Sequence, residues 1–344
     1  MSVQLFAGVR GVPETRATHG WRHLLEHLIL KGKDGKLDER LESQGVFFVG
    51  RTYRDAMQIE FTATPDKLPL ILAAIDEILA APLPKAEEIA KEIGIMRQEF
   101  ALQGDFSQLS RTAWQAAFEE TGLDPFGDLE VMAKATPEAL TDLKSKHFSP
   151  ANLVLVVCGN LDKIKTTETL KRFLEEREGP EVTLNPPRKG EPGRREAEDA
   201  FGEVRAALST GLDDAGALLC AAFAIATRLE NAGVTYTPTT ASGLVLVSRT
   251  DANNTIGMSI DELTESEEAA LFPIARVMAE RWVSSQLATP SGCAYLRGLL
   301  MSQNGSARPE SLRDAIRLTN WSSFRAAIAR FRRDKVVTAV GVGH

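Results

Sequence analysis

The first half of the chain alternates short apolar runs with longer segments of helical spacing. The run VQLFAGVRG (3–11) predicts a strand, and residues 20–31 repeat apolar positions at helical spacing. Two runs of strand character, GVFFVGRTY and DAMQIEFTAT, are separated by a short connection and predict a hairpin. The next predicted elements are a helix that starts near Pro65-Asp66 and ends before APLPKAEE, and helices over 85–104, 107–121 and 137–147. An apolar strand over 151–162 and a helix to about residue 176 follow. This half therefore predicts an α+β unit.

The second half repeats this order after a segment without apolar periodicity. Residues 177–200 combine prolines, glycines and charges of both signs, which is typical of a linker. The elements predicted beyond it are a strand (FGEVRAALST), a helix over 213–232, the strand-rich stretch VTYTPTTASGLVLVSRTDANNTIGMSID, helices over 264–288, 291–303 and 308–331, and a strand (KVVTAVGVG). We expect an α+β fold of two repeated units, over 1–176 and 201–344, each a mainly antiparallel sheet covered on one face by helices.

Charge and cysteine content narrow the class of protein. The 344 residues carry a formal net charge of −7, which argues against a nucleic-acid partner because phosphate backbones attract basic surfaces. We find no apolar window of about 18 residues and no secretory-signal pattern, so we expect a cytoplasmic protein without membrane contact. Cys158, Cys220 and Cys293 lack metal-type spacing, and we expect buried free thiols.

The sequence HLLEH within the first predicted helix raises the possibility of a zinc site. His23 and His27 are four residues apart, so their imidazoles project from one face of a helix. Two imidazoles and a carboxylate hold zinc with one position open for water, and Glu26 beside them is a candidate base. The alternative is an ordinary helix with solvated histidines, and a third ligand is needed to decide.

A second predicted helix offers that ligand. Glu92 and Glu99 in EEIAKEIGIMRQEFALQ are seven residues apart, which places both carboxylates on one helical face two turns apart. Glutamates on helices are usually solvated, so neither residue alone indicates a metal site.

Together these segments resemble the pitrilysin (insulinase-like, inverzincin) family of zinc metallopeptidases, to which the mitochondrial processing peptidase is related. HLLEH matches the inverted zinc motif, and EIGIMRQE is similar to the family segment that ends in the third ligand. The stretch after the histidines, DPFGDLE and the passage ATPEALTDLKSKHFSPANLVLVVCGNLD also look like this family, so the resemblance covers about residues 3 to 175.

The resemblance implies a zinc metalloendopeptidase and gives each residue a role. His23, His27 and Glu99 would bind zinc, Glu26 would be the general base, and Glu92 would orient a ligand. In this family the peptide substrate pairs as a strand with the edge of the first sheet, which is β-augmentation. We therefore expect hydrolysis of short unfolded peptides with broad sequence tolerance.

Two positions depart from the family pattern in the substrate-holding half of the site. Val49 stands where the family usually has an asparagine, so one polar contact to substrate is missing. RLENAGVTYT resembles the passage of the second domain that supplies an arginine and a tyrosine. Tyr236 is retained as a candidate catalytic residue, whereas Glu230 stands at the arginine position. Tyr236 can equally be a strand residue without a catalytic task.

Other functions and assemblies stay open at this stage. The chain could be a non-catalytic or partner-dependent subunit of a heterodimeric peptidase, or a protease dedicated to maturing one peptide. The family resemblance implies either a homodimer or a heterodimer with a related subunit.

Overall fold

The computed structural model describes residues 1–8, 14–82, 85–102, 104–175, 177, 189–198, 200–239, 242–250, 256–304, 308–332 and 336–342. Its described residues form two compact units, and each unit is discontinuous in sequence. The first unit draws on Met1–Ala101, Pro125–Asn185 and Gln286–Gly305. The second unit draws on Leu102–Asp124, Pro186–Ser285 and Ser306–His344.

The first unit contains an antiparallel sheet of four strands in the order β2-β3-β1-β4. The strands are β1 (Ser2–Gly8), β2 (Phe47–Thr52), β3 (Ala56–Thr62) and β4 (Leu153–Cys158). Strands β2 and β3 form the predicted hairpin, in which Phe47 pairs with Thr62 and Thr52 pairs with Met57. Strand β1 is buried at all seven of its positions, which indicates that both faces of the sheet are covered.

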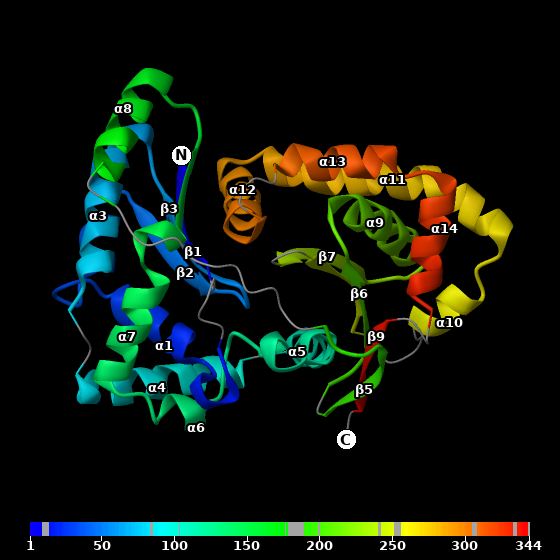
Figure 1. The fold of residues 1–344 in the computed structure, drawn as a ribbon, viewed down its shortest axis with the longest axis horizontal. Helices are drawn as coiled ribbons and strands as arrows, with labels where there is room; N and C mark the ends of the chain where they lie inside the picture. Colours follow the sequence, from blue (N-terminus) through cyan, green and yellow to red (C-terminus); the bar gives the residue numbers. More distant parts are fainter. Residues whose placement is uncertain are drawn as a thin grey trace. The chain divides into compact units, whose positions relative to one another are not determined.

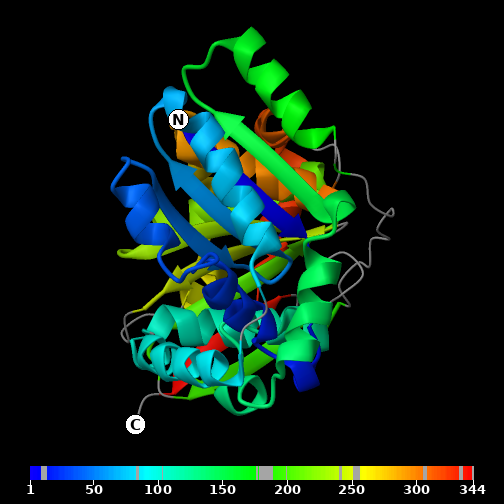
Figure 2. The same cartoon turned by 90° about the vertical axis from the view of Figure 1, so that its left-hand side faces the viewer.

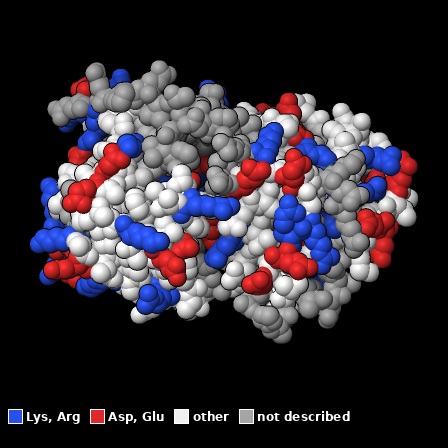
Figure 3. Space-filling view, turned by 60° about the horizontal axis from the view of Figure 1, so that its bottom comes forward, with Lys and Arg blue, Asp and Glu red and all other residues white. Residues whose placement is uncertain are grey.

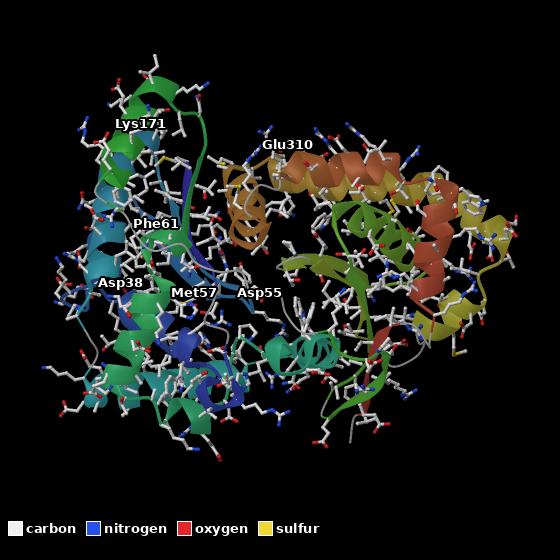
Figure 4. The ribbon with its side chains drawn as sticks, in the orientation of Figure 1. Asp38, Asp55, Met57, Phe61, Lys171 and Glu310 are labelled. Atoms are coloured by element: carbon white, nitrogen blue, oxygen red, sulfur yellow. The ribbon has the colours of Figure 1, made fainter. Side chains whose placement is uncertain are left out.

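Helices of the first half of the chain cover one face of this sheet. They are α1 (Trp21–Ile29), α2 (Leu37–Glu42), α3 (Leu68–Ala80), α4 (Ala86–Ala101), α6 (Leu129–Met132), α7 (Pro137–His147) and α8 (Lys163–Leu174). Figure 2 shows α3 lying across the sheet. The core between them includes Val3 and Leu5 of β1 and Leu24 of α1. It also includes Met57 and Phe61 of β3, which are labelled in Figure 4.

A helix from the second half of the chain, α12 (Pro290–Asn304), covers the opposite face of the first sheet (Figure 1). Successive side chains of a strand point to opposite faces, so Phe6 faces away from the core that contains Leu5. Phe6 packs with Leu299 of α12, and a Cβ at Gly298 would overlap the Phe6 ring. The first unit is therefore completed by a segment more than a hundred residues away in sequence.

The second unit contains a five-stranded sheet in the order β5-β9-β6-β8-β7. All neighbouring strands pair antiparallel except β5 and β9, which are parallel. The strands are β5 (Gly193–Glu198), β6 (Glu203–Ser209), β7 (Ala232–Thr239), β8 (Ser242–Arg249) and β9 (Val337–Val342). This mainly antiparallel sheet repeats the layout of the first unit.

The helices of the second unit are α5 (Asp105–Phe118), α9 (Leu212–Thr227), α10 (Ile256–Asp261), α11 (Glu265–Leu287), α13 (Pro309–Leu318) and α14 (Trp321–Arg330). Helix α5 comes from the first half of the chain, and its Leu109 and Trp114 share a core with Val204 and Leu246 of the sheet. Helix α9 contacts the same strands and packs against α13 and α14. Each unit thus receives one helix from the opposite half of the sequence.

The predicted α+β class with two mainly antiparallel sheets is confirmed. Helices cover both faces of each sheet instead of one, and each unit takes a helix from the other half of the sequence, so the units are not the contiguous ranges 1–176 and 201–344. The remaining differences are local. Residues 256–261 form α10, although the sequence predicted a strand-rich stretch there. The helix predicted over 308–331 is two helices, because Asn320 caps α14 by accepting the Ser323 backbone N–H at 2.9 Å. Residues 193–198 of the predicted linker form β5, and 178–188 of that linker lie outside the described residues.

Lys and Arg side chains are intermixed with Asp and Glu on the face shown in Figure 3. None of the helices in the described part of the chain combines the length and apolar character needed to cross a membrane.

Candidate metal centre

Helix α1 begins at a glycine whose backbone requires the absence of a side chain. Gly20 has a φ of 89°, and a Cβ there would lie 2.8 Å from the Cα of Gly127. Glu14 Oε1 accepts the backbone N–H groups of Gly20 at 3.1 Å and of Arg22 at 3.0 Å. This carboxylate satisfies two donors at the helix N-terminus, where negative charge is favoured. The start of α1, and hence the direction of its two histidines, is determined by these contacts.

The two histidines lie on the face of α1 opposite its leucines. Leu24, Leu25 and Leu28 are buried in the core of the first unit. At helical spacing His23, Glu26 and His27 share the other face. The Nε2 atoms of the histidines are 3.2 Å apart.

A hydrogen bond at Nδ1 orients each imidazole. The Nδ1–H of His23 donates to the Phe126 carbonyl oxygen at 3.1 Å, because a carbonyl can only accept. The Nδ1–H of His27 donates to Glu92 Oε1 at 3.0 Å. With Nδ1 protonated, each neutral ring presents the lone pair of Nε2, which is the form that binds metals.

Glu99 of α4 brings a carboxylate to the same point. Its Oε2 lies 3.5 Å from His27 Nε2 and 3.8 Å from His23 Nε2. One ligand atom from each of the three residues lies within 4.8 Å of the others. The structure therefore brings together the three residues that the sequence singled out as zinc ligands.

The donor set fits a zinc ion. Four ligands at about 2.0–2.1 Å in a tetrahedron lie about 3.3–3.5 Å from one another, close to the separations between these three atoms. Two Nε2 lone pairs that face each other at 3.2 Å repel, and a cation bound by both removes this repulsion. Two imidazoles and one carboxylate leave the fourth zinc position open for water, as in catalytic zinc sites.

Glu26 is the buried carboxyl group beside this cluster. Only 6% of its surface is exposed, and this burial raises the pKa of Glu26 to about 7, although Thr52 and His27 lower it in part. Thr52 Oγ1 of β2 donates to Glu26 Oε2. Gly50 of the same strand leaves room for this carboxyl, since a Cβ there would lie 2.5 Å from Glu26 Oε1. A carboxyl group with a pKa near neutrality is suited to general base catalysis.

Glu92 lies behind His27 and contacts a cation. Its side chain is buried, its Oε1 accepts from His27, and its Oε2 pairs with Lys31 Nζ. Burial acts to raise the pKa of Glu92, but the hydrogen bonds from His27 and Lys31 outweigh it and hold the pKa below its usual value. Glu92 is therefore a hydrogen-bond acceptor for Nδ1 of His27, on the side of the ring away from the metal-binding Nε2.

Sequence reasoning missed Lys31, Thr52 and the Phe126 carbonyl. The spacing of Lys31, four residues after His27, could have placed it on the same side of the helix. Thr52 is in the hairpin strand and Phe126 is about a hundred residues from the histidines, so their contacts depend on the fold.

The residues expected in the substrate-holding half lie in both units. Val49 is 44% exposed on β2. Tyr236 is a buried residue of β7 in the second unit, where burial raises the pKa of its hydroxyl. Glu230 is exposed after α9. Arg228, two residues before it, forms an ion pair with Glu267 at 3.1 Å. The catalytic role of Tyr236 stays a prediction.

Sequence profiles of one peptidase family match two segments of the chain. The profile described as "Insulinase (Peptidase family M16)" matches residues 2–123, and "Peptidase M16 inactive domain" matches residues 134–213. An uncharacterized zinc protease of Streptomyces coelicolor is 25% identical over 182 residues, which are 50% of this chain and 39% of that protein. The chain thus spans less than half the length of this curated relative.

Solved structures share the fold over nearly the whole chain. A protease from Helicobacter pylori superposes with a TM-score of 0.78 at 17% identity, covering 98% of this chain and 92% of that one. The periplasmic protease PqqL from Escherichia coli gives a TM-score of 0.70 at 16% identity, covering 100% of this chain and 45% of that one. The chain therefore has the α+β fold of these proteases. It belongs to the insulinase family, peptidase family M16.

Proposed function

We propose that this chain is a zinc-dependent endopeptidase or oligopeptidase that hydrolyses short unfolded peptides. The observation that carries the proposal is the convergence of His23, His27 and Glu99 beside the buried carboxyl group of Glu26, with ligand atoms within 4.8 Å. The relationship to zinc proteases supports it.

Each side chain of the cluster has a task in this reaction. His23, His27 and Glu99 hold the zinc ion, which when bound supplies a Lewis acid and a water of lowered pKa. Glu26 accepts a proton from the attacking water and then donates it to the departing amine of the peptide. Thr52 holds the Glu26 carboxylate in place through its hydroxyl.

Hydrogen bonding behind His27 maintains its ligand form. Glu92 accepts the Nδ1–H of His27, and Lys31 pairs with the other Glu92 oxygen. This chain of contacts keeps Nε2 directed at the zinc position.

The edge strand β2 supports an extended peptide as the substrate. Among the described strands of the first unit β2 pairs with β3 alone, so its other edge can accept a peptide as an added strand. Phe47 and Val49 are 58% and 44% exposed on this strand. Main-chain pairing along β2 gives affinity with little dependence on side chains, and the apolar side chain of Val49 adds no hydrogen bond to it.

The test compares wild type with Glu26→Gln in zinc content and in cleavage of a fluorogenic peptide library. We expect one zinc per chain in both proteins and a rate about 10²–10⁴-fold lower in Glu26→Gln. Glu42→Gln, at an exposed position of α2, is the control and should keep the wild-type rate. An unchanged rate in Glu26→Gln, or a purified chain that binds no zinc, would overturn the proposal.

A second candidate is a zinc-bearing subunit that hydrolyses peptides only together with a related chain. One observation favours it: Glu230 stands where the family supplies an arginine. Cleavage assays with and without a co-encoded partner distinguish a self-sufficient peptidase from a partner-dependent subunit. The same assays on a set of different peptides would identify a maturation protease, because it would cleave one sequence only. Sedimentation of the purified chain tests the homodimer expected from the family.

A further inference from the structure

Two cysteines from distant parts of the sequence meet in the first unit. Cys158 ends β4 and Cys293 lies in the first turn of α12, and their Sγ atoms are 3.4 Å apart. Both thiols are free, as expected from the sequence, but both residues are half-buried where buried ones were expected. A disulfide bond is about 2.05 Å long, so the sulfurs need to approach by about 1.3 Å.

Contacts that do not involve the sulfurs hold α12 against β1, the strand that pairs with β4. Gln4 Nε2 of β1 donates to the Ser291 carbonyl oxygen at 2.9 Å, next to the start of α12. One turn past Cys293, Gly298 lies against the ring of Phe6. The cysteines are therefore neighbours because α12 is packed on this face of the sheet, and the pair is maintained while the unit is folded.

The surroundings of the two sulfurs differ, and this difference bears on which cysteine reacts first. Arg297 Nε donates to Cys293 Sγ at 3.4 Å, so a cationic hydrogen-bond donor lies beside this sulfur. Burial, together with the hydrogen bond to Cys293, raises the pKa of the Cys158 thiol to about 12. We assign the first attack to Cys293, because its sulfur lies beside the Arg297 guanidinium, and the second step to Cys158.

We propose that Cys158 and Cys293 form a reversible disulfide that fastens α12 to β4 when the chain meets a low-molecular-weight disulfide such as oxidised glutathione. Cys293 gives up its proton, and its sulfur attacks one glutathione sulfur and releases the other glutathione as a thiolate. Cys158 then gives up its proton and displaces the second glutathione from Cys293. Two protein thiols are oxidised, one glutathione disulfide is reduced to two thiols, and both protons end on glutathione.

The disulfide has a structural consequence that does not depend on peptide hydrolysis. It joins residues 135 positions apart and encloses much of the second unit's sequence between its ends. Closing so long a loop restricts the unfolded chain and stabilises the fold. Helix α12, held on the sheet by packing and hydrogen bonds, becomes covalently attached.

The experiment equilibrates the full chain with oxidised or reduced glutathione and counts free thiols after denaturation at low pH. We expect three thiols in the reduced chain and one in the oxidised chain, with peptide mass mapping showing the Cys158–Cys293 link. The melting temperature should rise by about 5 °C on oxidation and fall back with dithiothreitol.

Cys220→Ala is the matched control, because Cys220 is fully buried in α9 and burial raises its pKa to about 11. This variant should lose both remaining thiols on oxidation, whereas Cys293→Ser should form no internal disulfide and no thermal shift. Three thiols left in the oxidised wild type, a bond that includes Cys220, or a disulfide between two chains would each overturn the proposal.

Discussion

Glu92 Oε1 lies 3.0 Å from Nδ1 of His27, while its other oxygen contacts Lys31. A carboxylate in this position selects the imidazole tautomer that directs Nε2 toward Glu99. The buried glutamate thus acts on the metal cluster through a histidine.

Replacing Glu92 should weaken zinc binding without removing a ligand. We expect Glu92→Gln to bind zinc about 10–100-fold more weakly, because the amide is a weaker acceptor for His27 and leaves Lys31 without its charge partner. Competition with a chelating dye measures the affinity. Glu87→Gln, at an exposed position of the same helix, should bind zinc like wild type, and equal affinities in the two variants would contradict the prediction.

Thr52→Val should shift the pH dependence of peptide hydrolysis. The Thr52 hydroxyl lowers the pKa of Glu26, so its removal raises that pKa further and the carboxylate is lost at a higher pH as the solution is acidified. We expect the acidic limb of the kcat/KM profile to move up by about one pH unit. Thr62→Val, at the exposed end of β3, should leave the limb unchanged. A limb that stays in place in Thr52→Val would show that the hydroxyl does not influence the base.

His147 should make the fold sensitive to acid. It is fully buried at the end of α7, and burial, with the nearby charge of Arg22, lowers its pKa to about 3. Below about pH 6.5 the imidazole of His147 is protonated in the unfolded chain but stays neutral in the folded chain. The contribution of neutral His147 to the free energy of unfolding is therefore full above that pH and is lost as the pH falls. The loss is up to about 1.4 kcal/mol per pH unit.

Urea unfolding of the metal-free protein between pH 6.5 and 4.5 measures this effect. His147→Gln stays neutral across the range, so its unfolding free energy should fall less steeply than that of wild type. Parallel curves for the two proteins would contradict the assignment.

Gly298→Val should test whether α12 is part of the first unit. The valine side chain has no space beside the buried ring of Phe6, and overpacking of this kind costs about 1–3 kcal/mol. Met301→Val, at an exposed position of the same helix, is the control. Equal unfolding free energies of the two variants would show that α12 does not pack on β1.

Local spacing explains which features could be predicted from the sequence. His23 and His27 share a helix face because four residues make about one turn, and Glu92 and Glu99 do so because seven make about two. The alternation along the β2–β3 hairpin and the apolar β4 likewise follow from strand geometry. These periodicities depend only on neighbours in the chain, so they indicated the α+β class and placed these histidines and glutamates on shared helix faces. Their roles as ligands were implied by the resemblance to the pitrilysin family.

Contacts between distant segments required the structure. Phe126 reaches His23 across 103 positions and Cys158 reaches Cys293 across 135, and no periodicity links such pairs. Helix α5 belongs to the first half of the sequence but packs in the second unit, and α12 belongs to the second half but packs in the first unit. Each sheet has two apolar faces, and the helices from its own half of the sequence cover only one of them. The sequence therefore determined the elements and the chemistry that each one carries. The tertiary fold decided which of those elements meet, since that depends on burying apolar faces across the whole chain.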